Sequence, residues 1–141
     1  MANLIYNRGL DELAAWTSST YKFLCMKGTG YTPDKDHDFV ADLTPGSNEI
    51  AGAGYARVTA SSKTRTVDDT LDRITYDCDD PAFGSIVAGE TITAIVLCRF
   101  VTNDADSILI AYFDVADRAT NGAPFTPTIP ATGLLYTDQG T

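Results

Sequence analysis

Residues 91–115 read TITAIVLCRFVTNDADSILIAYFDV, and this stretch decides the fold. It contains two apolar segments, 91–101 and 108–115, separated by the polar turn 103–106. Two apolar segments joined by a short polar turn predict a β-hairpin. The first segment carries apolar residues on both of its faces, which is typical of a central strand.

Shorter segments on both sides of this hairpin also alternate between apolar and polar residues, as half-buried strands do. One of them, residues 125–130, contains Pro127 and Pro130 and follows Pro124, so we expect an edge strand or an extended segment there. The further predicted strands are residues 20–27, 54–61, 64–67, 73–78, 125–130 and 134–136.

Residues 8–16 are the best helix candidate, with Leu10, Leu13 and Ala14 on one face, and the polar loop 31–43 is expected to close with a helical turn at residues 38–43. The chain is therefore predicted to be mainly β: a single-domain antiparallel β-sandwich over residues 1–141, with about seven to eight short strands and one short N-terminal helix. Residues 137–141 are expected to form a polar tail.

Alternation within each strand commits one of its faces to the interior. In segment 91–101 it places Ile92, Ala94, Val96, Cys98 and Phe100 on one face and Ile95 and Leu97 on the other. The predicted core of the whole chain comprises Phe23, Cys25, Val58, Ile74, Tyr76, Ile92, Val96, Cys98, Ile110 and Leu134.

The composition bears on the class of partner. The chain has 141 residues with 10 Lys and Arg against 19 Asp and Glu, a formal net charge of −9. A field of this sign repels phosphate, so no nucleic-acid partner is expected. No apolar run reaches the roughly 18 residues of a membrane span, and residues 1–6 do not resemble a signal peptide, so we expect no membrane association and synthesis in the cytoplasm.

The acidic residues are unusual in kind, because 16 of the 19 are Asp and only three are Glu. Aspartate is favoured in turns and disfavoured within helices and strands. The chain also contains 19 threonines, which suit half-exposed strands. This usage indicates many short strands joined by tight turns.

The three cysteines, Cys25, Cys78 and Cys98, lie in apolar stretches and form no C-x-x-C pair. With His37 as the single histidine, a zinc site of ordinary Cys and His spacing is excluded. We expect buried, reduced thiols that act as small hydrophobic residues, as in a protein that folds in a reducing cytoplasm.

Asp34, Asp36 and Asp38 have the spacing that opens a calcium-binding loop, and they are weak candidates for metal ligands. Phe39 stands where the loop glycine belongs and Pro45 where the closing acid belongs, so we expect a solvated acidic loop and no metal or cofactor. His37 has no accompanying nucleophile motif, so no catalytic residue and no enzyme activity are predicted.

Residues 1–6 are a possible N-terminal arm. Leu4, Ile5 and Tyr6 are consecutive and have no acidic neighbour, unlike the rest of the chain. An extended apolar segment can add to the open sheet edge of a neighbouring subunit, which makes these three residues candidates for partner binding. The alternative is that they form the first strand of the chain's own sheet.

An ordered series of segments covers roughly residues 21–136: YTPDKDHDFV (31–40), GAGYAR (52–57), DRITYD (72–77), AGET (88–91), NDADSILIAYFD (103–114), NG (121–122) and GLL (133–135). The series resembles small virion proteins encoded in the structural gene clusters of tailed bacteriophages. Members of this group look like head decoration, or cement, proteins or other minor structural proteins.

The resemblance implies a capsid decoration protein on the capsid surface of the virion, made in the cytoplasm of the host bacterium. Its expected partners are the major capsid protein, whose lattice it would bind to stabilise the head, and copies of itself as an oligomer. The group offers no catalytic residues. Two alternatives stay open: a neck, tail or fibre-attachment protein, or a carbohydrate-binding β-sandwich adhesin whose aromatic rings stack on sugars.

Overall fold

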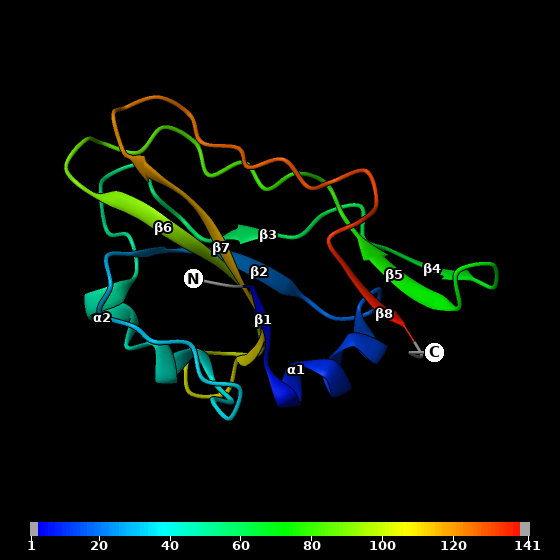
Figure 1. Cartoon of the computed structure of the whole chain (residues 1–141). Coiled ribbons are helices and arrows are strands. Elements are labelled where there is room, and N and C mark those ends of the chain that lie inside the picture. Colours follow the sequence, from blue (N-terminus) through cyan, green and yellow to red (C-terminus); the bar gives the residue numbers. More distant parts are fainter. Residues whose placement is uncertain (1–2, 139–141) are drawn as a thin grey trace.

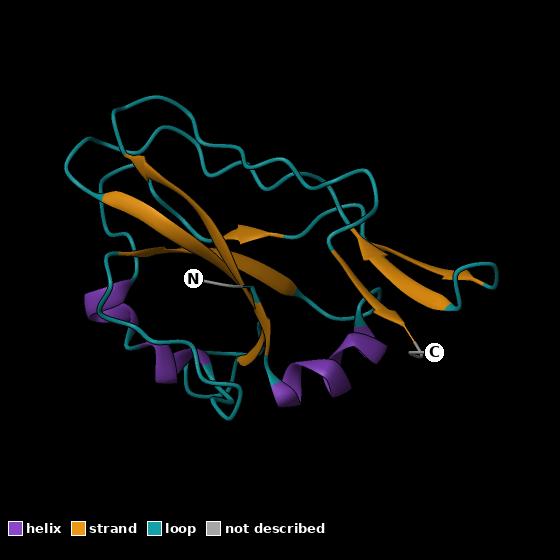
Figure 2. Cartoon of the chain, viewed as in Figure 1, coloured by secondary structure: helices purple, strands orange, loops and turns teal. Residues whose placement is uncertain are grey.

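The computed structural model describes residues 3–138 and confirms a mainly β fold. Its eight strands form two antiparallel sheets (Figures 1 and 2). The elements are β1 (Leu4–Ile5), α1 (Asn7–Glu12), the 3-10 helix η1 (Leu13–Ala15), β2 (Tyr21–Lys27), the 3-10 helix η2 (Val40–Leu43), α2 (Pro45–Asn48), β3 (Val58–Thr59), β4 (Thr64–Asp68), β5 (Arg73–Asp77), β6 (Thr91–Arg99), β7 (Ile108–Ala119) and β8 (Leu135–Asp138).

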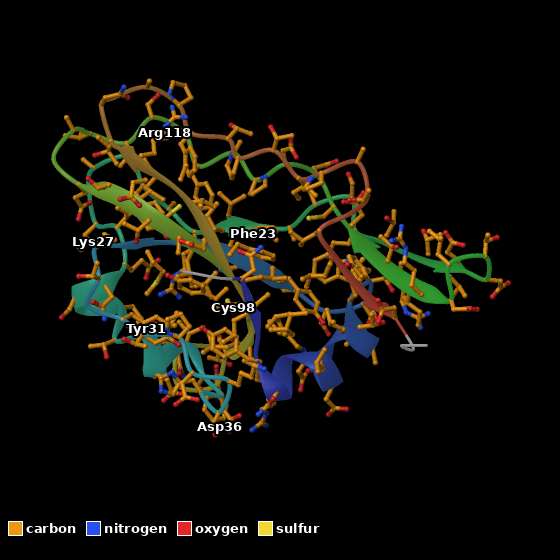
Figure 3. The ribbon with its side chains drawn as sticks, viewed as in Figure 1. Phe23, Lys27, Tyr31, Asp36, Cys98 and Arg118 are labelled. Atoms are coloured by element: carbon orange, nitrogen blue, oxygen red, sulfur yellow. The ribbon has the colours of Figure 1, made fainter. Side chains whose placement is uncertain are left out.

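The larger sheet has the strand order β1-β7-β6-β2-β3, and the predicted hairpin forms its centre as β6 and β7. Five consecutive residues of β6, 94–98, are buried, as expected for a central strand. One core cluster lies on each face of this sheet, and Phe23 and Cys98 belong to different clusters (Figure 3).

The predicted faces of β6 are wrong at one point. The register shifts between Ile92 and Ala94, so Thr93 is an extra residue opposite β2. Such a bulge reverses the direction of every later side chain relative to strict alternation. Ile92 therefore packs in the same cluster as Ile95 and Leu97, and the opposite cluster holds Ala94, Val96 and Cys98.

The predicted core residues are nevertheless inside. Val58, Ile74 and Leu134 are half-buried and pack against the first cluster, and the other seven are buried. This confirms that alternation within a strand identifies interior positions even where a bulge changes which side of the sheet they face.

Both faces of the larger sheet are covered mainly by irregular chain. Residues 28–50, which include η2 and α2, contribute Tyr31, Val40 and Leu43 to the second cluster. Residues 79–90 and 121–134 run side by side over the other face (Figure 1), joined where the Phe83 N–H donates to the Phe125 carbonyl. The predicted strand at 125–130 is an extended segment, and only Val58–Thr59 of predicted strand 54–61 pairs in the sheet.

The smaller sheet has the order β4-β5-β8. Tyr76 and Leu135 lie opposite each other in it and belong to the same core cluster as Phe23 and Leu97 of the larger sheet. The two sheets therefore share one core in a β-sandwich-like arrangement. The β4–β5 hairpin projects from the body of the molecule, as Figure 1 shows.

The predicted N-terminal helix begins at Asn7 and divides into α1 and η1. It lies against β7, where the Tyr6 N–H donates to the Ile110 carbonyl. The approach is closest at Gly9, because a Cβ there would lie 2.6 Å from both the Cα and the carbonyl oxygen of Ile110. A side chain at this position cannot be accommodated without moving the helix away from the sheet.

We therefore predict that Gly9→Ala lowers the free energy of unfolding by about 1–3 kcal/mol, the usual cost of overpacking a tight contact. Chemical denaturation followed by tryptophan fluorescence measures the loss. Gly46→Ala is the matched control, because a Cβ at Gly46 meets nothing within 4 Å. Equal stability of the two variants would contradict the close packing of α1 on β7.

Candidate interaction surface

The structure places Leu4, Ile5 and Tyr6 in the chain's own sheet. Leu4 and Ile5 form β1, opposite Tyr112 and Ala111 of β7. Tyr6 has no exposed surface, and its hydroxyl lies 2.9 Å from that of Tyr31. This arrangement matches the own-strand alternative and corrects the interpretation of these residues as a free arm. Residues 1–2 of that segment lie outside the described residues. The predicted polar tail 137–141 is wrong at its start, because Thr137 and Asp138 belong to β8; residues 139–141 lie outside the described residues.

The three aspartates of the acidic loop serve local structure. Asp34 accepts a hydrogen bond from the Asp36 backbone N–H at 3.0 Å, and Asp36 accepts one from the Asn7 side chain at 2.9 Å. Asp38 pairs with Arg8 at 3.7 Å. Within residues 3–138, no group of three or more His, Cys, Asp or Glu side chains is placed to hold a metal ion.

His37 anchors the same loop to the core. Its Nδ1 atom lies 2.9 Å from the Tyr31 hydroxyl, which in turn contacts the Tyr6 hydroxyl. Burial raises the pKa of both tyrosines. The chain of contacts therefore joins loop, core and N-terminal strand through neutral hydroxyl groups.

No sequence pattern predicts the half-buried ion cluster around Arg57. Its guanidinium donates to both carboxylate oxygens of Glu49, at 2.8 and 2.7 Å, and to Asp104 at 2.5 Å. The Tyr55 hydroxyl also donates to Glu49, at 2.7 Å. The hydrogen bonds of Arg57 to Glu49 and Asp104 raise the pKa of Arg57. They also connect the segment after α2, which contains Glu49, to the β6–β7 turn, which contains Asp104.

Glu90, next to the first residue of β6, likewise connects separate segments of the chain at the opposite end of that strand. Its carboxylate accepts hydrogen bonds from Lys27 Nζ at 2.5 Å and from the backbone N–H groups of Ala51 and Gly52 at 2.9 and 2.7 Å. The Lys27 hydrogen bond is the main reason that the pKa of Glu90 lies below its ordinary value. The donors come from two separate stretches of chain, β2 and residues 51–52, so the Glu90 carboxylate joins both to the start of β6.

The cysteine thiols are free. Cys25 and Cys98 lie in clusters on opposite faces of the larger sheet, so the sheet itself separates them. Burial raises the pKa of Cys78 and of Cys98 to about 12, which keeps both as thiols at neutral pH. A protonated thiol is a poor nucleophile and a poor metal ligand, which fits a packing role.

The surface has an apolar groove beside β1, formed by two adjoining hollows of about 470 and 240 Å³. Asn3, Phe113, Pro130 and Leu134 line both hollows. We call it the β1–β8 groove, because one hollow runs from Leu4 and Ile5 of β1 to Leu135 and Tyr136 of β8. Apolar walls at the rim of two sheets make this groove the candidate interaction surface.

Tyr136 stands at this groove with 52% of its surface exposed. No local pattern in the sequence marks Tyr136 as a binding residue, because the groove forms where the proline-rich segment 127–130 and β8 lie near β1. These pieces are more than a hundred residues apart, and local alternation carries no signal of their proximity. Exposed aromatic residues beside an apolar groove are typical of protein-binding surfaces.

Comparison with known proteins adds no relative: no family model, curated protein or solved structure matches the chain. Among the described residues, no helix has the length and apolar character needed to cross a membrane.

The Glu90 contacts predict a pH dependence of stability. Because the folded state lowers the pKa of this carboxyl, the contacts stabilise the fold at pH values above the ordinary pKa of 4.5. The stabilisation is lost as the pH falls through the depressed folded-state pKa. Glu90→Gln should therefore melt below the wild type at neutral pH, and the difference should shrink in acid below about pH 4.5.

Scanning calorimetry between neutral pH and about pH 3 follows this change. Asp117→Asn is the control, because it removes one negative charge at an exposed position of β7. A melting-temperature difference for Glu90→Gln that stays constant with pH would contradict the assignment of its stabilising effect to the charged carboxylate.

Proposed function

We propose that the chain is a structural protein of a tailed-bacteriophage particle that acts as a capsid decoration protein, binding the major capsid protein lattice and stabilising the head. The observation that carries the proposal is the ordered resemblance over residues 21–136 to small virion proteins. The groove supports it, because a decoration protein works by burying surface against its neighbours.

The ion pairs of the described residues connect parts of the fold to each other, which leaves the β1–β8 groove as the surface available to a partner. The carboxylates of Glu49 and Glu90 are engaged with Arg57 and Lys27, and Arg99 pairs with Glu12. These groups hold irregular segments together. The β1–β8 groove, in contrast, offers an apolar wall and the ring of Tyr136, which is 52% exposed although the Arg73 guanidinium lies 5.1 Å from the ring centroid.

Copy number in purified particles tests the position on the virion. Quantitative mass spectrometry of particles from the phage that encodes the chain should give hundreds of copies per major capsid shell. Ring-like numbers of about six to twelve would instead indicate a neck or tail protein and overturn the decoration assignment. A density map of the intact particle should show the chain outside the capsid lattice.

We predict that Tyr136→Thr weakens particle binding by about tenfold or more, because an aromatic anchor at an interface commonly contributes about 2 kcal/mol. Threonine retains strand propensity, so the variant should fold normally. The measurement is occupancy on particles stripped of the protein and incubated with a concentration series. Val87→Thr is the matched control, since Val87 is 54% exposed on a loop away from the groove.

Unchanged occupancy for Tyr136→Thr would place the attachment surface elsewhere than the β1–β8 groove. Equal loss for both variants would contradict a local role for the groove.

A further inference from the structure

The strand β4 is an open edge. It lies at one end of the order β4-β5-β8 and pairs only with β5. The side chains of residues 64–67 are all exposed, and Val67 keeps 59% of its surface accessible to solvent. The hairpin stands away from the body of the molecule (Figure 1), so the described chain leaves this edge uncovered.

Proteins usually protect such an edge from pairing with another strand. The common devices are a proline, charged side chains (lysine above all), a bulge or a very short strand. The five residues of β4 are TRTVD: they contain no proline or lysine, and their pairing with β5 runs without a register shift. The two charged residues of β4, Arg65 and Asp68, have opposite signs, so a second copy can meet them with opposite charges. The outer edge of β4 therefore remains competent to accept a further strand.

We infer that β4 pairs in antiparallel orientation with β4 of a second copy of this chain. Two copies would then form one continuous six-stranded sheet in the order β8-β5-β4-β4-β5-β8. This self-pairing is independent of the proposed function, because it is a property of the isolated protein and uses β4, the edge of the small sheet opposite β8 and its groove.

Symmetry and charge select the register. A two-fold axis perpendicular to the sheet keeps each face continuous across the dimer, so one residue of β4 must lie opposite itself. Centring on Arg65 would set two like charges together, which is unfavourable. Centring on Thr66 would set Arg65 opposite Val67, without a counterion, and Asp69 opposite Lys63, whose ammonium group already donates to the Ser19 carbonyl.

Centring on Val67 satisfies both requirements. The two exposed valines then lie opposite each other and cover apolar surface. Arg65 faces Asp69 of the second copy, at the start of the β4–β5 turn, and Asp69 faces Arg65 in return. In the part of the chain that the structure describes, Arg65 makes no ion pair with another residue, so it is available for this contact.

The expected dimer is weak and reversible. A five-residue strand contributes few hydrogen bonds, and each copy carries a net charge of −9, so the copies repel at long range. Sedimentation velocity over a concentration series should show a monomer that converts to a dimer as concentration rises. A chain that remains monomeric at all concentrations would overturn the inference.

A charge exchange tests the register. Arg65→Glu alone, or Asp69→Arg alone, sets like charges opposite each other at two symmetric positions and should weaken dimerisation on the order of tenfold. The double variant Arg65→Glu/Asp69→Arg restores opposite charges and should regain dimerisation. Circular dichroism and melting temperature establish that each variant is folded. Failure of the double variant to recover would overturn the proposed register.

Cross-linking provides an independent readout. In Val67→Cys the two introduced thiols lie side by side across the axis, so a short bis-maleimide should join two copies with high yield at concentrations where the wild type dimerises. Val87→Cys is the matched control, because its side chain is similarly exposed on a loop. Equal cross-linking of the two variants would mean random collision and would overturn the pairing.

Discussion

The pairing of β6 with β7 is the constraint on which the rest of the structure depends. β6 is buried on both faces, so each face of the larger sheet must be covered. Register shifts interrupt the pairing, and at the second one β7 has Ile110 as an extra residue. The Ile110 carbonyl accepts a hydrogen bond from the Tyr6 N–H, and the backbone of Ile110 packs closely against Gly9 of α1. One irregularity of β7 therefore positions both the first strand and the first helix.

The covering layers contain little regular structure, so side chains supply much of their hydrogen bonding. Carboxylates accept hydrogen bonds from backbone N–H groups of their own turns: Asp42 from Phe39, Asp68 from Thr70, and Asp106 from Asn103. A short side chain reaches its own turn more readily than a long one. The preference for Asp over Glu is thus a property of a fold with long irregular connections.

Local pattern predicted the central hairpin, most of the strands and the interior positions, because each depends on neighbouring residues; it overextended the strand at 54–61, of which only Val58–Thr59 pairs. It did not predict the bulge at Thr93, since one extra residue leaves the apolar run of β6 unbroken. It also left Tyr6 undecided between arm and core, because only the distant Tyr31 settles that question. The Arg57 cluster and the β1–β8 groove were missed for the same reason: their residues meet only in the folded chain.

The two proposed surfaces lie on opposite edges of the same small sheet, with the groove beside β8 and the self-pairing edge on β4. In the proposed decoration role, a molecule held through its groove keeps the β4 edge clear of that contact. Attachment of two copies to one lattice raises their effective concentration for each other, so a contact that is weak in solution becomes substantial on a particle. A five-residue strand edge suits this use, because a stronger contact would assemble the chain before it reached the lattice.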